Sequence, residues 1–423
     1  MFAFILAALM TGLSAFDYTN SVGENLHVDQ HIGEWQNYPY LESFLKAERI
    51  KFVRSSLTIY PGNGYSDFMN KLNADLGINA VEIVGPSITT PEQIDTLVKL
   101  RHGSVILEGP NEPDVCCGDM NWIAHTKATM TALAAYHAMH PEIPIVAPAI
   151  SMADPAVAAD LTAVPQFGNA HPYTGRRPPE TTGWGGPVYG QIYGSLAYNI
   201  ADAQRFVGQE PVIATEAGFS TANVTEATQS AYIQRQTLWD FMNGIVKTIL
   251  YDLVDDSQGY GLARIDGSMK PAAYGLQGLR AALWDTKPFI GTCSLDVTIQ
   301  TTVAYKSLLL CKSNGERDLV LWQPTQLQDP DTGAATPATP ADLSISANGV
   351  GLKTIIYLQT PNSHWTWQNA PLRGKITGAL TERPLIIAFN AAPTLAIDAL
   401  PVIGTGLLNG IPIAPGTAKV SPN

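Results

Sequence analysis

Two glutamates stand where a pair of carboxyl groups could do chemistry together. Glu112 follows the apolar run Val105–Glu108, and Glu216 ends the apolar run Pro211–Glu216. Cleavage of a glycosidic bond with retention of configuration needs such a pair: one carboxyl protonates the leaving oxygen and one carboxylate attacks the anomeric carbon. The two groups must differ in pKa, because one has to be protonated while the other is ionised. The pair is therefore a candidate for this reaction if the fold brings the two side chains face to face.

Short apolar runs alternate with amphipathic stretches between residues 24 and 285. In the longer stretches the apolar residues recur at the spacing of a helix face. Eight such strand–helix units predict a (β/α)8 TIM barrel over residues 17–286. A doubly wound open sheet is the alternative, but no GxGxxG turn follows the first run. The predicted strands are Asn25–Gln30, Lys51–Leu57, Asn79–Val84, Val105–Glu108, Ile143–Ala147, Gln166–His171, Pro211–Glu216 and Lys247–Leu253.

Polar residues at the C-terminal ends of barrel strands face the active site. The fourth and seventh strands lie on roughly opposite sides of an eight-stranded ring, so Glu112 and Glu216 can face each other across the barrel mouth. Arg54 and Tyr173 are the right residue types to hold Glu216 ionised and oriented. Asn111, beside Glu112, could hydrogen-bond a sugar 2-hydroxyl. The other candidate substrate-binding residues, at strand ends or in the long loop after the sixth strand, are Asp29, His31, His171, Trp184 and Tyr251.

The segments around these residues resemble glycoside hydrolase clan A. They are Asn111–Pro113 after the fourth strand, His171–Tyr173 at the sixth, Thr215–Gly218 at the seventh and Tyr260–Ala272 after the eighth. The resemblance implies a retaining hydrolase of β-glycosidic bonds in an oligo- or polysaccharide, with Glu112 as acid/base and Glu216 as nucleophile. A barrel followed by a β-rich region is most similar to family 39-like members. The eighth strand lacks the tryptophan that many clan members place under the sugar, so the aromatic floor of the sugar subsite is left open.

After Lys287 the helical stretches stop, and short β-rich runs separated by turn residues follow. The simplest interpretation is an antiparallel β-sandwich over residues 287–390, with a linker or tail over 391–423. Cys293 and Cys311 lie on two strand-like runs and could pair across them, although sequence alone cannot fix connectivity. Residues 1–16 are apolar and end in small residues, as a signal peptide does, and this favours a secreted or periplasmic protein. A buried first strand is the alternative.

Charge and composition restrict the partners. The formal net charge of −12 speaks against nucleic acid or an anionic membrane, since either favours a basic face. No run reaches the roughly 18 uninterrupted apolar residues of a membrane span. A carbohydrate substrate is compatible with this charge. His27, Asp29 and His31 alternate along the first strand, share one of its faces and could be metal ligands. Clan A chemistry needs neither a metal nor a cofactor, however, and we expect none.

Each functional interpretation has a structural alternative. Glu108 ends the fourth strand and is interpreted as a buried, paired group rather than as the acid. Glu112 could instead cap the following helix, Glu216 could be a structural salt-bridge partner, and His171 could be a core histidine. Trp184 could be a loop-packing aromatic. The same residues would also suit a transglycosylase or a catalytically inactive carbohydrate-binding barrel, and an inverting enzyme would hold its carboxyls roughly 6.5–9.5 Å apart instead of about 5–5.5 Å.

Overall fold

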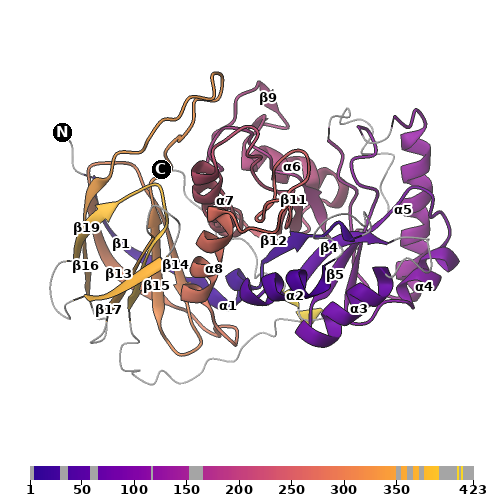
Figure 1. The fold of residues 1–423 in the computed structure, drawn as a ribbon, viewed down its shortest axis with the longest axis horizontal. Coiled ribbons are helices and arrows are strands. Elements are labelled where there is room, and N and C mark those ends of the chain that lie inside the picture. Colours follow the sequence, from indigo (N-terminus) through magenta and orange to yellow (C-terminus); the bar gives the residue numbers. More distant parts are fainter. Residues whose placement is uncertain are drawn as a thin grey trace.

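The computed structural model describes residues 4–28, 37–57, 65–115, 118–151, 165–348, 354–359, 365–370, 376–389, 407–408 and 411–412. Figure 1 shows two parts side by side, a strand barrel surrounded by helices and a pair of packed β-sheets. The predicted fold class, a TIM barrel with a C-terminal antiparallel β-sandwich, is confirmed.

Eight parallel strands form the barrel, in the order β7-β6-β5-β4-β3-β12-β11-β8. A parallel bridge between Val146 and Phe167, with a 2.9 Å hydrogen bond from the Ala147 N–H to the Phe167 carbonyl, joins the two ends of this sheet. The ring therefore closes, and the strand ends converge on one mouth. The strands are β3 (Val22–Asn25), β4 (Phe52–Leu57), β5 (Asn79–Val84), β6 (Val105–Glu108), β7 (Ile145–Val146), β8 (Gly168–Ala170), β11 (Val212–Ala217) and β12 (Ile245–Leu250).

The first barrel strand lies earlier in the chain than predicted. β3 ends at Asn25, where the predicted strand began. The strand contains Glu24 and Asn25, two polar residues that are almost completely buried, so hydrophobicity alone places it too late. Leu26 and Val28, which suggested a strand, are buried in the core just beyond its end.

Helices cover the outside of the barrel, and side-chain caps fix the starts of several of them. The hydroxyl of Ser195 accepts a hydrogen bond from the N–H of Tyr198 at the start of α6, and Thr225 does the same for Thr228 at the start of α7. Residues 152–164, between β7 and β8, lie outside the described part of the chain. None of the helices described is long and apolar enough to cross a bilayer. The helices are α1 (Ala15–Thr19), α2 (Tyr38–Ala47), α3 (Tyr65–Leu76), α4 (Pro91–Val98), α5 (Trp122–Met139), α6 (Leu196–Val207), α7 (Glu226–Met242) and α8 (Pro271–Leu283).

The sandwich packs a four-stranded sheet, β1-β13-β16-β19, on a six-stranded sheet, β18-β17-β20-β15-β14-β2. Inward-facing Leu295 and Val297 of the first sheet share one core with Leu309 and Leu319 of the second. Cys293 and Cys311 form a disulfide, the pairing that the sequence left open. The strands are β1 (Phe4–Thr11), β2 (Leu13–Ser14), β13 (Ser294–Thr301), β14 (Lys306–Cys311), β15 (Arg317–Trp322), β16 (Ala341–Asn348), β17 (Thr354–Gln359), β18 (Trp365–Ala370), β19 (Ile376–Leu380) and β20 (Leu385–Phe389).

The N-terminal strands β1 and β2 belong to the sandwich. β1 pairs antiparallel with β13, and β2 pairs parallel with β14. Between them, Gly12 packs so closely on the disulfide that an added Cβ would lie 2.2 Å from Sγ of Cys311. This pairing corresponds to the alternative of a first strand, and removal of residues 1–16 as a signal peptide stays a prediction. Of the predicted tail 391–423, the structure describes β21 (Leu407–Leu408) and β22 (Ile411–Pro412).

The sandwich also contacts the loop that follows β8. Glu180 of this loop accepts a hydrogen bond from Nε1 of Trp322 in β15 at 2.5 Å and forms a 2.5 Å ion pair with Arg235 of α7. Nη1 of Arg235 donates in turn to the carbonyl of Thr325 at 3.0 Å. These side chains are buried, and the sandwich therefore fixes a loop at the mouth of the barrel.

Candidate active site

Glu216 lies at the end of β11 and is held by two donors from other strands. Nη1 of Arg54, on β4, donates to Oε1 of Glu216 at 2.8 Å. The hydroxyl of Tyr173, which follows β8, donates to Oε2 at 2.9 Å. The Glu216 side chain is 10% exposed and that of Arg54 only 2%, so the carboxylate is fixed in a largely dry pocket with one face toward the barrel mouth.

These surroundings make Glu216 a strongly acidic group. Burial alone would raise its pKa, but the charges of His171 and Arg54 and the hydrogen bonds from Arg54 and Tyr173 outweigh it and lower the pKa to about 2. Burial and the Glu216 charge hold the pKa of Tyr173 well above its usual value of 10, so the phenol remains a proton donor. Glu216 is therefore ionised at any pH at which a protein normally works.

Glu112 occupies the turn after β6 and is more open to solvent. Its side chain is 27% exposed, and Nδ1 of His171 lies 2.8 Å from its Oε1. The backbone φ of Glu112 is +39°, in the left-handed region that a non-glycine residue rarely adopts. Such conformations cost about 1–3 kcal/mol and cluster at active sites, where the surrounding structure holds them in place.

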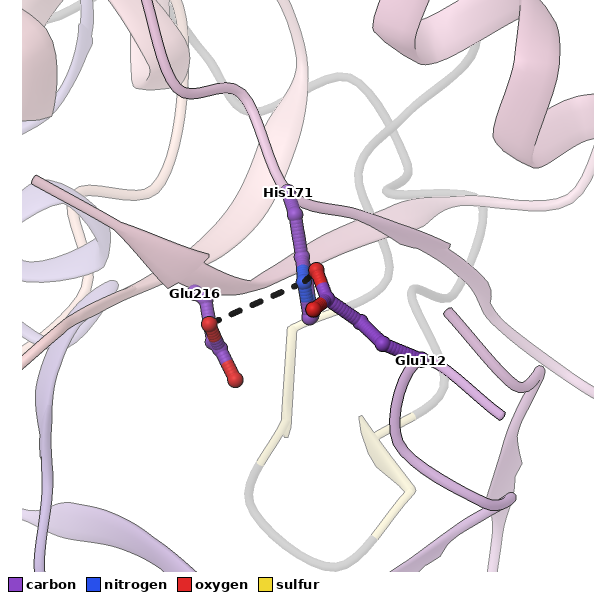
Figure 2. Close-up of side chains that lie close together, drawn as sticks. All are labelled: Glu112, His171 and Glu216. Atoms are coloured by element: carbon purple, nitrogen blue, oxygen red, sulfur yellow. Dashed lines mark hydrogen bonds and ion pairs between the residues drawn. The ribbon is translucent and has the colours of Figure 1, made fainter. Parts of the chain in front are cut away.

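The two glutamates and His171 converge on one point of the barrel mouth (Figure 2). A carboxylate oxygen of Glu112, a carboxylate oxygen of Glu216 and a ring nitrogen of His171 all lie within 4.8 Å of one another. Nδ1 of His171 is 3.7 Å from Oε2 of Glu216, so the imidazole stands between the two carboxyl groups. One oxygen of Glu112 and one of Glu216 are thus within 4.8 Å, an approach compatible with the ~5–5.5 Å spacing of carboxyl groups in retaining glycosidases.

Glu108 is buried at the base of the site and is fully paired. Arg54 donates to it from Nε at 2.6 Å and from Nη2 at 2.8 Å. Asn169 of β8 donates to Oε1 of Glu108 at 2.9 Å, and the Thr215 hydroxyl lies 3.1 Å from the same atom. The interpretation of Glu108 as a buried, paired group is confirmed, and its charge keeps the Arg54 guanidinium in place beneath Glu216.

Two residues of this network, Asn25 and Asn169, were not among the predicted site residues. Nη1 of Arg54 donates to Oδ1 of Asn25 at 2.9 Å, and Asn25 donates to the carbonyl of Thr215 at 3.1 Å. Both asparagines lie within buried strands, where a polar side chain is unusual. A polar residue within an otherwise apolar strand could have marked these two positions in the sequence. Only the strand register, however, shows that both side chains point into the barrel.

Some of the remaining predicted residues contact the site, and others lie outside the described part of the chain. Asn111 accepts a hydrogen bond from Nη2 of Arg54 at 2.7 Å. Tyr251 packs edge-to-face on Tyr260, which in turn packs on Tyr173, with ring centroids 5.7 and 5.4 Å apart. Tyr260 is thus a further aromatic of the site, supplied by the loop after β12. Asp29 and His31 lie outside the described residues.

Trp184 lines a pocket of about 170 Å³ that opens beside Glu112. It lies in the loop after β8, where the short strands β9 (Pro187–Val188) and β10 (Gln191–Ile192) form a hairpin. The indole is 40% exposed, and the guanidinium of Arg177 lies 4.6 Å from its ring centroid. Trp184 is therefore both packed in the loop and available at the pocket surface.

A cation is the other ligand that Glu112, His171 and Glu216 could hold, because their oxygen and nitrogen atoms are close enough to share one. The Arg54 guanidinium, however, already places a positive charge 2.8 Å from Glu216. A second cation beside it would be repelled at a site that is shielded from water. The arrangement is better suited to moving a proton than to binding a metal.

Comparisons with solved structures agree with the fold. A family 39 glycoside hydrolase from Bacteroides cellulosilyticus WH2 aligns with a TM-score of 0.56 and 14% identity over 89% of this chain and 82% of that chain. A GH128 endo-β-1,3-glucanase from Sorangium cellulosum gives 0.41 and 15% over 58% and 96%, and Saccharomyces cerevisiae Gas2p, in complex with laminaritetraose and laminaripentaose, gives 0.42 and 15% over 67% and 68%. No protein-family model and no curated protein matches the chain. At these identities the similarity to glycoside hydrolases, including the expected one to family 39, is established for the fold alone.

Proposed function

We propose that this protein is a retaining glycoside hydrolase that cleaves β-glycosidic bonds in an oligo- or polysaccharide. One observation carries the proposal: Glu112 and Glu216 present carboxylate oxygens within 4.8 Å of each other at the mouth of a (β/α)8 barrel. A water molecule does not fit between a bound sugar and a second carboxylate at such a distance, as inversion would require. Direct attack by one carboxylate does fit.

Glu216 is the nucleophile of the proposed first step. One oxygen of its carboxylate attacks the anomeric carbon and forms a glycosyl ester, while the bond from that carbon to the leaving oxygen breaks. With a pKa lowered to about 2, the group is ionised before substrate binds. Arg54 and Tyr173 hold the carboxylate in one orientation, so little reorganisation is needed when the reaction begins.

Glu112 is the proton donor of the same step. Its greater exposure suits a group that must meet the leaving oxygen and later a water molecule. In the second step the ionised Glu112 takes a proton from water, the oxygen of that water attacks the anomeric carbon, and the ester to Glu216 breaks with net retention. His171, 2.8 Å from Glu112, orients the carboxyl through both steps.

Asn111 and the aromatic residues are assigned to substrate binding. Oδ1 of Asn111 accepts from Arg54, which leaves its amide N–H groups to donate to a sugar hydroxyl such as the 2-hydroxyl. Tyr251 and Tyr260 provide aromatic surface near Glu216, and Trp184 provides it on the Glu112 side; the C–H face of a pyranose packs on such surface. Tyr251 and Tyr260 take the place of the strand-eight tryptophan under the sugar that Glu216 attacks.

We place the protein outside the cytoplasm, secreted or periplasmic. The Cys293–Cys311 disulfide supports this location, because structural disulfides persist in oxidising compartments. An external glycan as substrate fits the same location.

The proposal is tested by screening β-linked polysaccharides and aryl β-glycosides with three proteins: the wild type, Glu216→Gln and Glu92→Gln. Glu92 is an exposed residue in the first turn of α4, outside the barrel, and is the matched control. We expect turnover of at least one substrate, a loss on the order of 10⁴-fold in Glu216→Gln, and no change in the control. Wild-type activity in Glu216→Gln would overturn the assignment, and product analysis separates transfer to sugar from transfer to water.

A further inference from the structure

The pocket of about 170 Å³ lies on the Glu112 side of the carboxyl pair. At one end it is lined by Glu112, His171 and Tyr173, and it extends from there to α6. Glu216 is not among the described residues that line it. Glu112 is the group that meets the leaving oxygen in the proposed reaction, so a cavity on its side receives what lies beyond the scissile bond.

An aromatic wall bounds this pocket. Trp184, Tyr193 and Tyr198 all line it, and their rings touch in sequence, with centroids 5.8 Å apart for Trp184 and Tyr193 and 4.9 Å for Tyr193 and Tyr198. Trp184 and Tyr193 are 40% and 41% exposed. Large aromatics that stay accessible beside a catalytic carboxyl provide the apolar surface on which a sugar ring packs.

The wall is rigid before any ligand binds. Residues 189 and 190 both have positive φ, 51° and 75°, as a tight two-residue hairpin turn between β9 and β10 requires. The N–H of Trp184 donates to the carbonyl of Tyr193 at 3.0 Å, which ties the two aromatic residues together. Gly194 has a φ of +85°, and an added Cβ there would lie 2.4 Å from the Trp184 ring. The position of the indole thus depends on a glycine at 194.

The charged groups of the pocket are paired with one another. Its lining includes the carboxyls of Glu112 and Asp202 and, among the residues the structure describes, no lysine or arginine. Arg205 lies near Asp202 but forms a 2.8 Å ion pair with it and is not part of the lining. The nearby cationic groups already have carboxyl partners: His171 contacts Glu112 at 2.8 Å, and Arg205 pairs with Asp202. A carboxylate-bearing sugar would therefore lose its hydration and gain no new counter-charge, whereas a neutral sugar can donate its hydroxyls to Asp202.

We infer that this pocket is the leaving-group subsite and that it takes one neutral sugar unit of the glycan. The inference rests on the proposed function and adds the chemical class of the unit that departs. The aromatic wall receives the ring face, and Asp202 and Asn199 receive its hydroxyls. The size agrees with one unit, because the volume is below the ~300–1,000 Å³ of pockets that hold larger ligands.

The test compares two substrates with the same glycone: the β-glycosyl fluoride and the β-linked disaccharide of the sugar that the screen identifies. Fluoride leaves without occupying the pocket, whereas the disaccharide must fill it. We expect Trp184→Ala to lower kcat/KM for the disaccharide ~10- to 100-fold and to change that for the fluoride by less than about twofold. Trp184→Phe keeps an aromatic ring and should recover most of the loss.

The charge is tested with a second disaccharide whose leaving unit is the corresponding uronic acid. The wild type should prefer the neutral disaccharide by ~100-fold or more, and Asp202→Asn should reduce this preference at least about tenfold. Asp95→Asn, which breaks an exposed ion pair with Lys99 on α4, is the matched control and should leave the preference unchanged.

Three results would overturn the inference. An equal loss on fluoride and disaccharide in Trp184→Ala would show that the pocket does not belong to the leaving group. A wild type that accepts the uronic acid as well as the neutral unit would contradict the neutral class. Absence of wild-type turnover on every fluoride would contradict the proposed function itself. It differs from the other two outcomes, because in those the wild type still turns over the fluoride.

Discussion

The guanidinium of Arg54 binds two carboxylates that have different roles in the site. Glu108 is almost completely buried and binds the guanidinium through two hydrogen bonds, whereas Glu216 binds one nitrogen and faces the barrel mouth. A buried cation needs this much negative charge around it, because transfer from water is costly. The pair Arg54–Glu108 is thus the fixed base of the site, and Glu216 is the group that it keeps ionised.

Tyr173 contributes one hydrogen bond to that ionisation, so its removal should have a measurable pH signature. Tyr173→Phe deletes the 2.9 Å bond to Oε2 of Glu216 but keeps the ring. The pKa of Glu216 should then rise from about 2, and the acid limb of the kcat/KM profile should move to higher pH. We expect kcat to fall ~10- to 100-fold. An unchanged acid limb would contradict the role assigned to Tyr173. The control is Tyr38→Phe, because Tyr38 is a half-buried tyrosine whose hydroxyl donates to Asp75 outside the site.

At the scale of residues, the sequence could predict site groups only where it placed the strand correctly. Glu112, Glu216 and Tyr173 follow from the rule that polar strand ends face the barrel mouth, and Arg54 was chosen by the same rule although it lies in the middle of β4. Asn25 is the last residue of β3, which hydrophobicity placed too late, so its contact with Arg54 could not be anticipated. The inward direction of such a side chain depends on register, which a one-residue shift reverses.

The loop between β8 and α6 is the element that gives the site its individual shape. It contains the β9–β10 hairpin. Glu180, in the same loop, anchors it because its carboxylate binds Arg235 of α7 and Trp322 of the sandwich. Its unusual length predicted a functional loop, and Trp184 was a candidate on that ground. The hairpin itself was not predictable, because its strands are two residues each and the side chains that pack on it, Tyr198 and Arg205, come from α6.

A matched pair of glycines tests this element. Gly194→Ala adds a methyl group at a φ of +85° and 2.4 Å from the Trp184 ring, so the indole must move. Gly186 lies in the same loop with open space around it, so Gly186→Ala should leave kcat/KM unchanged on both substrates. We expect Gly194→Ala to lower kcat/KM on the disaccharide about tenfold while turnover of the glycosyl fluoride is kept. Equal behaviour of the two variants would mean that the hairpin does not position Trp184.

At the scale of the whole molecule, barrel and sandwich form one folded unit. The nitrogen Nε1 of Trp365 in β18 donates to the carbonyl of Gly275 in α8 at 2.9 Å, and the backbone of Leu327 donates to the hydroxyl of Tyr232 in α7 at 2.7 Å. The sequence predicted both parts from the change in periodicity near residue 287. It could not predict that β1 and β2 complete the sandwich, since their pairing is with strands almost three hundred residues away in the chain.

Several carboxyl groups buried in this unit make its stability depend on pH. Burial raises the pKa of Glu48 to about 8 and that of Asp240 to about 8. A raised pKa in the folded state stabilises the fold below the ordinary pKa and is lost as pH rises, because only the unfolded chain ionises freely. Glu216, with a pKa lowered to about 2, acts in the opposite sense and loses its contribution as pH falls below 4.5.

Stability should therefore be greatest near pH 4.5–5 and decline toward pH 8. Thermal unfolding followed by circular dichroism is expected to show a Tm lower by roughly 5–10 °C at pH 8 than at pH 5. Asp240→Asn removes one buried ionisable group, whose Oδ2 accepts from Thr248 at 3.2 Å, and should reduce that difference. A Tm that is flat or rises between pH 5 and pH 8 would contradict the assignment of these carboxyls as neutral in the folded protein.

The central claim is that Glu216 forms a covalent bond to the sugar, and trapping that bond tests it most directly. A 2-deoxy-2-fluoro glycoside of the accepted sugar with a good leaving group should form the ester and release it slowly, because the fluorine destabilises both transition states. We expect a mass increase of one fluorosugar per chain, located on Glu216 by peptide mapping and absent from Glu216→Gln. A label on Glu112 or another residue, or steady turnover of the parent glycoside with inversion and no label, would contradict it.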